Sequence, residues 1–195
     1  MSLGLLAILP HNLRTFEDVA RVPLALRELA PLDRSVSEQY WGRPRELLNF
    51  DIPEHWSVDS SHRRSPEEEW KQGGQLAYCS SAETTIYVGR RILIASTVAK
   101  WFTARRQPPL LAAANHFFEK LALALEAPEF IVYHDRNCIV YEYLYSGLSI
   151  EHVRAEIVAG GAIPAAAIED LYLTEAQLNH SATVPDFFYE SATSQ

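Results

Sequence analysis

The strongest hydrophobic pattern along the chain lies between residues 108 and 126. Apolar side chains recur there at the three- and four-residue spacing of a helix, and polar residues are confined to a narrow stripe from Asn115 to Lys120. The proline pair at 108 and 109 suits a first helical turn, whereas Pro128 cannot continue a helix. The pattern therefore predicts a central helix over residues 110–126, covered on more than one side.

The residues that follow this helix are predicted to form a two-stranded hairpin. Residues 130–134 are aromatic and β-branched, which favours a strand, and residues 135–137 are turn formers. Residues 138–145 alternate between two largely apolar sets, which predicts a return strand in the interior of the sheet. In that strand Glu142 shares a face with apolar neighbours, so we expect a buried carboxylate that is paired, protonated or next to a cleft.

Four further strands and several helices are expected elsewhere. The strands are predicted at residues 3–9, 75–80, 84–88 and 91–98. A helix should start after Thr15 and end at Pro31, with a kink or break at Pro23, and a short helix should follow over residues 33–41. Later helices should begin at a serine cap or a first-turn proline, namely at Ser65, Ser149 and Pro164. In the helix after Ser149, the pattern places Ile150, Val153, Ile157 and Val158 inward.

These elements predict an α+β fold in a single domain that spans residues 1–195. The sheet should be mainly antiparallel, with about four to six strands, and packed by the central helix and by flanking helices. Residues 32–75 are expected to be an irregular excursion, and the tail from about residue 181 is polar. Within that tail, the aromatic residues 187–189 either dock on the domain or contact a partner.

The charge of the chain is concentrated in its C-terminal third. The net charge is −8, yet residues 126–195 alone carry −9, because 11 acidic residues are opposed there only by Arg136 and Arg154. Nucleic acid is an unsuitable partner for such a surface, since phosphate binding requires cations. A basic protein partner fits it better. The candidate contact residues are Glu151, Glu156, Glu169, Asp170, Asp186 and Glu190.

Composition narrows the setting in which the protein is expected to work. The two cysteines, Cys79 and Cys138, are far apart and form neither a disulfide framework nor a zinc pattern. No apolar run approaches the roughly 18 residues of a membrane span, and residues 3–9 lack the flanks of a signal peptide. No glycine-rich phosphate loop is present. We therefore predict a cytoplasmic protein without a cofactor or a membrane partner.

An enzyme with an unfamiliar site is the alternative reading. His116 and Glu119 are three residues apart on the central helix, and His134 and Glu142 would lie near them if the hairpin folded over that helix. A second alternative concerns three arginine pairs, which could bind phosphate or RNA if they cluster in space: 63–64, 90–91 and 105–106.

Two segments of the chain resemble the closing half of small bacterial immunity proteins, which neutralise polymorphic toxins. They are NHFFEKLALALEAPEFIVYHD at residues 115–135 and SGLSIEHVRAEIVAGGAIP at residues 146–164. In those proteins a helix leads to a strand that ends in an acidic residue, and a capped helix then ends near Gly-Pro. The resemblance implies a single-domain cytoplasmic inhibitor without catalytic residues of its own. Together with the acidic C-terminal third, it favours a non-enzymatic binding protein with a basic partner.

Overall fold

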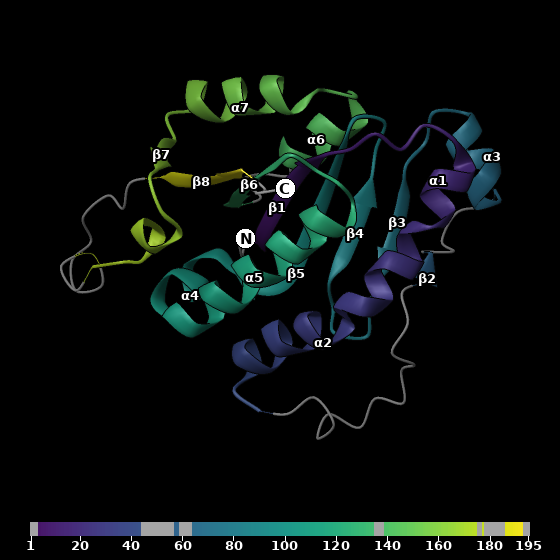
Figure 1. The fold of residues 1–195 in the computed structure, drawn as a ribbon. Helices are drawn as coiled ribbons and strands as arrows, with labels where there is room; N and C mark the ends of the chain where they lie inside the picture. The colour runs from purple at the N-terminus through teal and green to yellow at the C-terminus, as the bar shows by residue number, and fades with distance from the viewer. Residues whose placement is uncertain are drawn as a thin grey trace.

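The structure, a computed structural model of the chain, describes residues 4–43, 57–58, 64–134, 139–174, 177 and 186–192. Within this part the chain forms one eight-stranded sheet with helices on both faces (Figure 1). The strand order is β2-β3-β4-β5-β1-β6-β8-β7, and all neighbours are antiparallel except β7 and β8. The strands are β1 (Gly4–Pro10), β2 (Ser57–Val58), β3 (Leu76–Cys79), β4 (Thr85–Val88), β5 (Ile92–Lys100), β6 (Glu129–His134), β7 (Ile163–Ala165) and β8 (Phe187–Ala192).

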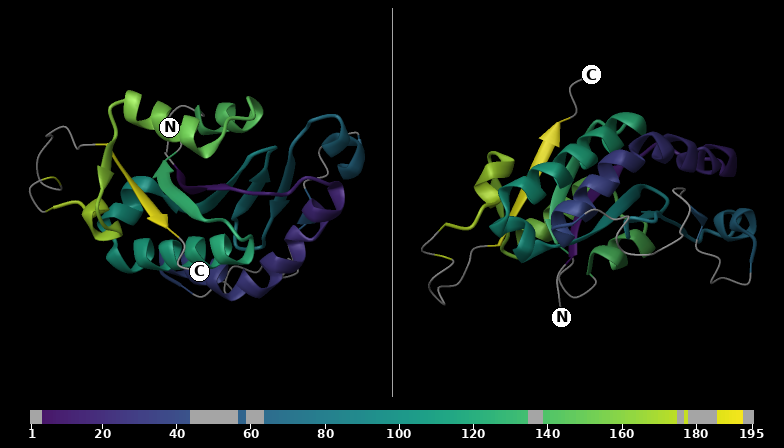
Figure 2. Two further views of the ribbon diagram at one scale, coloured as in Figure 1. Left: turned by 45° about the horizontal axis from the view of Figure 1, so that its top comes forward. Right: turned by 90° about the horizontal axis from the view of Figure 1, so that it is seen from below.

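Two layers of helices enclose the sheet, as the left view of Figure 2 shows. Successive residues of β1 point to opposite faces, so that Leu5 packs with the α2, α4 and α5 side and Leu6 with the α6 and α7 side. Residues 5–9 of β1 are completely buried, because β1 lies between β5 and β6 and helices cover both faces. The helices are α1 (Phe16–Ala20), α2 (Val22–Trp41), α3 (Pro66–Lys71), α4 (Trp101–Arg106), α5 (Pro108–Ala124), α6 (Ile139–Tyr145), α7 (Ile150–Ala159) and the 3-10 helix η2 (Ile168–Leu171).

The α+β class and the mainly antiparallel sheet are confirmed, but the sheet has eight strands rather than about four to six. The four strands expected outside the hairpin are present as β1, β3, β4 and β5. β2 and β7 are too short, at two and three residues, to leave an alternating pattern in the sequence. β8 comes from the aromatic residues of the tail, which dock between β6 and β7.

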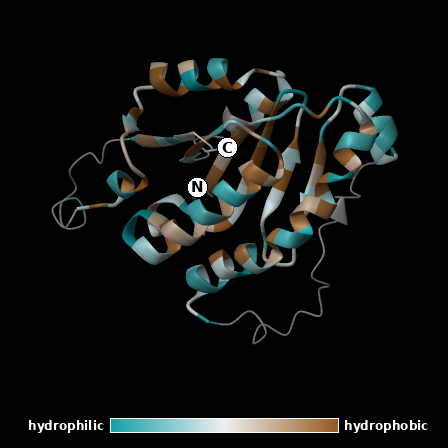
Figure 3. Cartoon of the chain, in the orientation of Figure 1, coloured by the Kyte–Doolittle hydropathy of each residue, from teal (hydrophilic) through white to brown (hydrophobic). Residues whose placement is uncertain are grey.

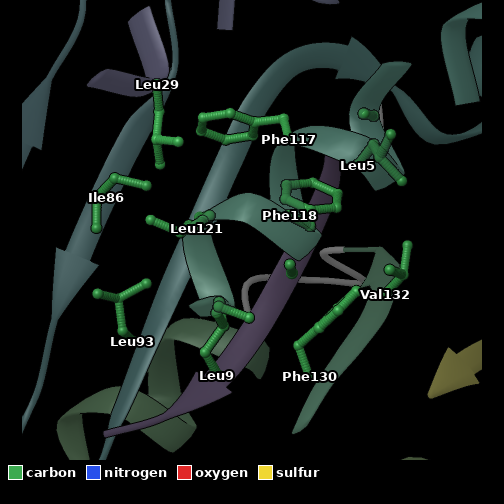
Figure 4. Packing of buried hydrophobic residues seen from close by; sticks show 14 of the residues in the cluster. Leu5, Leu9, Leu29, Ile86, Leu93, Phe117, Phe118, Leu121, Phe130 and Val132 are labelled. Atoms are coloured by element: carbon green, nitrogen blue, oxygen red, sulfur yellow. The ribbon is translucent and has the colours of Figure 1, made fainter. Parts of the chain in front are cut away.

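The central helix α5 is confirmed, at Pro108–Ala124 instead of 110–126. Its inward face presents Phe117, Phe118 and Leu121, which are completely buried against the sheet and against α2 (Figure 4). Burying an apolar side chain of this size stabilises a fold by about 1.5–3 kcal/mol. Figure 3 shows how hydrophobic and hydrophilic residues are distributed, with brown strands inside and teal positions on the helices around them. α5 therefore covers one sheet face together with α2.

The predicted return strand at residues 138–145 is wrong, because residues 139–145 form the helix α6. β6 pairs with β1 on one side and with β8 on the other, so no edge of β6 is open to a return strand. α6 instead lies on the sheet face opposite α5, where Leu144 packs with Ile92 and Ile94. Glu142 is consequently exposed on a helix and not buried in a strand. The predicted turn at residues 135–137 lies outside the described residues.

The first helical region departs from the prediction at its second proline. α1 starts after Thr15, as expected, with a capping box between Thr15 and Asp18, and Pro23 lies in the first turn of α2. Pro31, expected to end the helix, lies inside α2, which continues to Trp41. Leu29 and Val36 are buried on either side of this proline, and their packing outweighs the backbone hydrogen bond that proline removes. The predicted helix over residues 33–41 is the second half of α2.

The predicted irregular stretch at residues 32–75 is also only partly correct. It begins with the end of α2 and includes α3, whose cap at Ser65 is confirmed by reciprocal hydrogen bonds with Glu68. Residues 44–56 and 59–63 of this stretch lie outside the described residues. Among the helices that the structure describes, none is long and apolar enough to cross a membrane.

The helix predicted to start at Pro164 is wrong as well. Residues 163–165 form the strand β7, because β8 lies beside them and pairs with them in parallel. The chain then turns into the 3-10 helix η2, where Ile168 and Leu171 join the apolar cluster on the α5 side. The helix after Ser149 is confirmed as α7, but Val158 points outward.

His11 ties the end of β1 to the turn between β4 and β5. Its Nε2 lies 2.9 Å from the carbonyl oxygen of Gly89, and its Nδ1 accepts a hydrogen bond from the backbone N–H of Leu13 at 3.2 Å. The imidazole is therefore the neutral tautomer that donates from Nε2. Burial lowers the pKa of His11 from its ordinary value of 6.5, and the nearby charge of Arg14 acts in the same direction.

The buried His11 should make the protein lose stability in mild acid. Its pKa is lower in the folded than in the unfolded chain, so below about pH 6.5 the unfolded chain takes up the proton first. Its stabilising contribution is complete above that pH and decreases as the pH falls toward the lowered pKa. His11→Gln keeps a donor and an acceptor without the titration, so the loss of unfolding free energy between pH 7 and pH 5 should be smaller. The exposed His116→Gln is the control, and an equal decrease in both variants would contradict the prediction.

Candidate functional site

The helix α7 is held on the sheet by three buried residues, Ile150, Val153 and Ile157. Its opposite side faces outward and carries Glu151 and Glu156, both exposed. Hydrogen bonds from the Ser149 hydroxyl and from the backbone N–H of Glu151 itself lower the pKa of the Glu151 carboxyl. The carboxylate thus stays ionised and occupies the positive end of the helix dipole.

Arg154, on the same helix, forms two ion pairs with the sheet below it. Its Nε lies 2.5 Å from Oε1 of Glu190 on β8, and its second terminal nitrogen lies 2.6 Å from Oε2 of Glu129 on β6. The hydrogen bond that Arg154 donates to the Glu190 carboxylate is the main reason that the pKa of Arg154 is raised. One guanidinium therefore connects α7 with two strands through two ion pairs.

This double ion pair determines the charge of the surrounding surface. Arg154 is the only lysine or arginine after residue 136, so no other such cation is available in the C-terminal part. Glu142 and Glu156 have no ion pair with any described residue. Both carboxylates lie near the phenol of Tyr143. Burial raises the pKa of that phenol, and the charges of Glu156 and Glu142 raise it further. Negative charge accordingly gathers where α6 and α7 meet.

Two large apolar side chains lie on the same two helices. Tyr145 at the end of α6 is 76% exposed, and Val158 near the end of α7 is 49% exposed. An exposed aromatic residue among charged neighbours is a frequent anchor in protein interfaces. We define the α6–α7 face by its exposed residues Glu142, Tyr145, Glu151, Glu156 and Val158. The sequence pattern had placed Glu142 and Val158 inside.

The six acidic residues predicted to bind a partner do not share one surface. Glu151 and Glu156 lie on the α6–α7 face, whereas η2 places Glu169 and Asp170 on the α5 side of the sheet. Asp170 also accepts a hydrogen bond from the backbone N–H of Ala167 at 2.9 Å. The remaining two, Asp186 and Glu190, are engaged in contacts within the molecule.

Asp186 belongs to a buried polar cluster that fastens the C-terminal strand to the sheet. Its Oδ2 accepts a hydrogen bond from the hydroxyl of Tyr133 at 2.9 Å, and its Oδ1 lies 2.6 Å from Nε2 of His134. The ring of His134 stacks on Tyr133 with centroids 4.2 Å apart, and Trp101 lies at 5.3 Å on a tilted plane. His134 is 2% exposed. The pair is therefore placed to hold β8 and not to meet a substrate.

Arg105 completes this cluster from the side of α4. Its Nε donates to the carbonyl oxygen of Leu171 at 2.5 Å, and its guanidinium lies over the rings of Trp101 and Phe187. Burial lowers the pKa of Arg105, and the charge of Asp186 opposes that effect. Sequence spacing could not reveal this group, because its members come from four separate segments.

The residues of the alternative catalytic site are distributed over the molecule. His116 and Glu119 form an exposed pair on the outer side of α5, with 3.8 Å between Nδ1 and Oε2. Glu142 lies on α6, across the sheet from α5, and His134 is buried in β6. Among the residues that the structure describes, no three His, Cys, Asp or Glu side chains are grouped to hold a metal ion.

Arg63 lies outside the described residues, and the described arginines of the three pairs do not form a common patch. Arg90 lies over the ring of Trp70 and donates to the carbonyl oxygen of Trp70, whereas Arg91 is one of the residues that line a separate hollow. Arg105 is buried and Arg106 is exposed. Comparisons of the chain with protein-family models, with curated proteins and with solved structures found no match.

Proposed function

We propose that this chain is a non-enzymatic protein-binding module that holds a basic protein through the α6–α7 face. The observation that carries the proposal is the double ion pair of Arg154, the only lysine or arginine after residue 136. Because both of its carboxylate partners lie beneath α7, the outward carboxylates Glu142, Glu151 and Glu156 keep their negative charge available.

The chemistry of this face favours a protein partner. Three carboxylates attract a cationic surface over long range and accelerate the encounter. Tyr145 supplies a large apolar contact that a bound partner would remove from water. A toxin domain with a basic surface is the partner that the resemblance to immunity proteins implies. Such an inhibitor needs complementary shape and charge and no catalytic group.

The partner can be sought by affinity capture on the purified full-length chain, followed by mass spectrometry. Captures at low and high salt should differ, because attraction between exposed charges is screened by salt. We expect a basic polypeptide that is retained at low salt and released at high salt. Capture of no protein at either salt, or of partners insensitive to salt, would remove the support for this function.

Reversing two charges on the α6–α7 face should weaken binding of the captured partner. The variant Glu151→Lys/Glu156→Lys should slow association by about tenfold at low salt and flatten its salt dependence. The matched control is Glu169→Lys/Asp170→Lys, which changes the net charge equally on the α5 side of the sheet. Association rates measured by surface plasmon resonance at two salt concentrations test the prediction. Equal slowing in both variants would point to net charge and not to this face.

A further inference from the structure

A hollow of about 390 Å3 lies beside the α6–α7 face, at the end of β1. Three segments surround it: the loop after β1, the turn between β4 and β5, and the start of α7. Asn12, Arg14, Arg91 and Ser149 are among the residues that line it. The lining is therefore mostly polar, and the two arginines come from positions 77 residues apart in the sequence.

The walls of this hollow are fastened to each other by His11. Its backbone N–H donates to the carbonyl oxygen of Arg91 at 3.2 Å, and its imidazole contacts the carbonyl oxygen of Gly89 at 2.9 Å. Its second ring nitrogen accepts from the N–H of Leu13. The two segments that carry the arginines are thus cross-linked by one buried residue. A site built in this way is ordered before a ligand arrives, which reduces the entropy cost of binding.

The charge of the hollow is opposite to that of the protein as a whole. Arg14 and Arg91 bring two positive charges into it, and neither forms an ion pair with a described carboxylate. Glu151 is the one acidic group among the lining residues, so the lining keeps one net positive charge. His11 adds no charge, because it is held as the neutral tautomer.

From this convergence we propose that the hollow binds a small organic anion, with Arg14 and Arg91 as the groups that hold its charged end. A guanidinium presents a planar fork of donors that matches the oxygens of a phosphate or a carboxylate. The volume is at the lower end of the range for small-molecule sites, which indicates a ligand of metabolite size with an uncharged part beside its anionic group. Ile150 and Pro10 offer that part an apolar wall.

Calorimetric titration of the full-length protein at low ionic strength tests the proposal. The probes are glycerol 3-phosphate, succinate and inorganic phosphate, so that the ester, the carboxylate and the bare ion are distinguished. We expect one of the two organic anions to bind with 1:1 stoichiometry and more tightly than inorganic phosphate. Arg14→Gln and Arg91→Gln should each weaken it by about tenfold or more, since each removes charge-assisted hydrogen bonds.

Two further variants distinguish binding in the hollow from non-specific attraction of anions to the protein surface. Arg91→Lys keeps the charge but loses the planar fork, so its affinity should lie between those of the wild type and Arg91→Gln. Arg106→Gln removes an exposed arginine from α4 and should bind as the wild type does. Binding of inorganic phosphate alone, an equal loss in Arg106→Gln, or no binding of any probe at millimolar concentration would overturn the proposal. These titrations contain no protein partner, so they do not depend on the function of the α6–α7 face.

Discussion

Replacing Phe118 by alanine is expected to destabilise the protein by about 3–5 kcal/mol. The ring is completely buried at the centre of α5, lies 5.7 Å from that of Phe117, and packs against the sheet (Figure 4). Its removal forfeits the burial of a large apolar surface and leaves a cavity that the rigid sheet cannot close. Urea denaturation followed by circular dichroism measures the change in unfolding free energy.

Leu123 provides the matched control for that substitution. It lies on the same helix but is 45% exposed, so Leu123→Ala should change the unfolding free energy by only about 0.5 kcal/mol. Phe118→Leu retains most of the apolar volume, so its unfolding free energy should lie between those of the two alanine variants. If Phe118→Ala lowered the unfolding free energy no more than Leu123→Ala does, the burial of Phe118 could not be what fastens α5 to this sheet face.

The second large effect is expected at Asp186, which fastens the last strand to the rest of the sheet. In Asp186→Ala the Tyr133 hydroxyl and Nε2 of His134 both lose the partner seen in the structure. A buried polar group without a partner costs about 1–3 kcal/mol, so we expect the unfolding free energy to fall by roughly 2–4 kcal/mol in total. Because the contact holds β8 beside β6, hydrogen exchange of the amides in residues 187–192 should accelerate more than that of β1.

The control for Asp186 is the substitution to asparagine. Asp186→Asn removes the negative charge but keeps an oxygen that can accept the hydrogen bond from Tyr133, so its loss should be smaller than that of the alanine variant. Glu169→Ala, at an exposed acidic position, should be nearly neutral. A uniform increase in exchange over the whole sheet would indicate global destabilisation and contradict a local role in holding β8.

The stability of the C-terminal strand bears directly on the α6–α7 face. β8 carries Glu190, and Glu190 together with Glu129 engages Arg154 beneath α7. If β8 separated from β6, the double ion pair would open and the guanidinium would become available to the outward carboxylates. We therefore expect Asp186→Ala to weaken partner binding as well, although Asp186 does not lie on that face.

Elements with a strong local signal could be predicted from the sequence. α5 was predictable because helical spacing, a proline start and a narrow polar stripe all agree over residues 108–124. The strands β4 and β5 were predictable because β-branched residues recur in both and Gly89 marks the turn between them. The helical structure of residues 139–145 could not be predicted, because an apolar segment of this length fits either a strand or a short helix. The neighbours of β6 decide between them.

The candidate site divides in the same way. The surplus of acidic residues after position 125, and Arg154 as the last lysine or arginine, can be read directly from the sequence. The sequence does not reveal which of these acidic residues are available to a partner. Glu190 and Asp186 are engaged within the molecule and Glu156 is not, because of the residues that the fold brings near each of them. The hollow beside His11 left no sequence signal, because Arg14 and Arg91 belong to no common motif.

The sequence by itself determined the α+β class, the central helix, the early strands and the sign of charge in the C-terminal third. These properties depend on residue type and on spacing within a few positions, where backbone geometry imposes its period. Only the tertiary structure decided that residues 139–145 are helical, that the tail becomes β8, and that the predicted acids lie on two sides of the sheet. Each of these outcomes depends on contacts between distant segments, and such contacts override weak local preference.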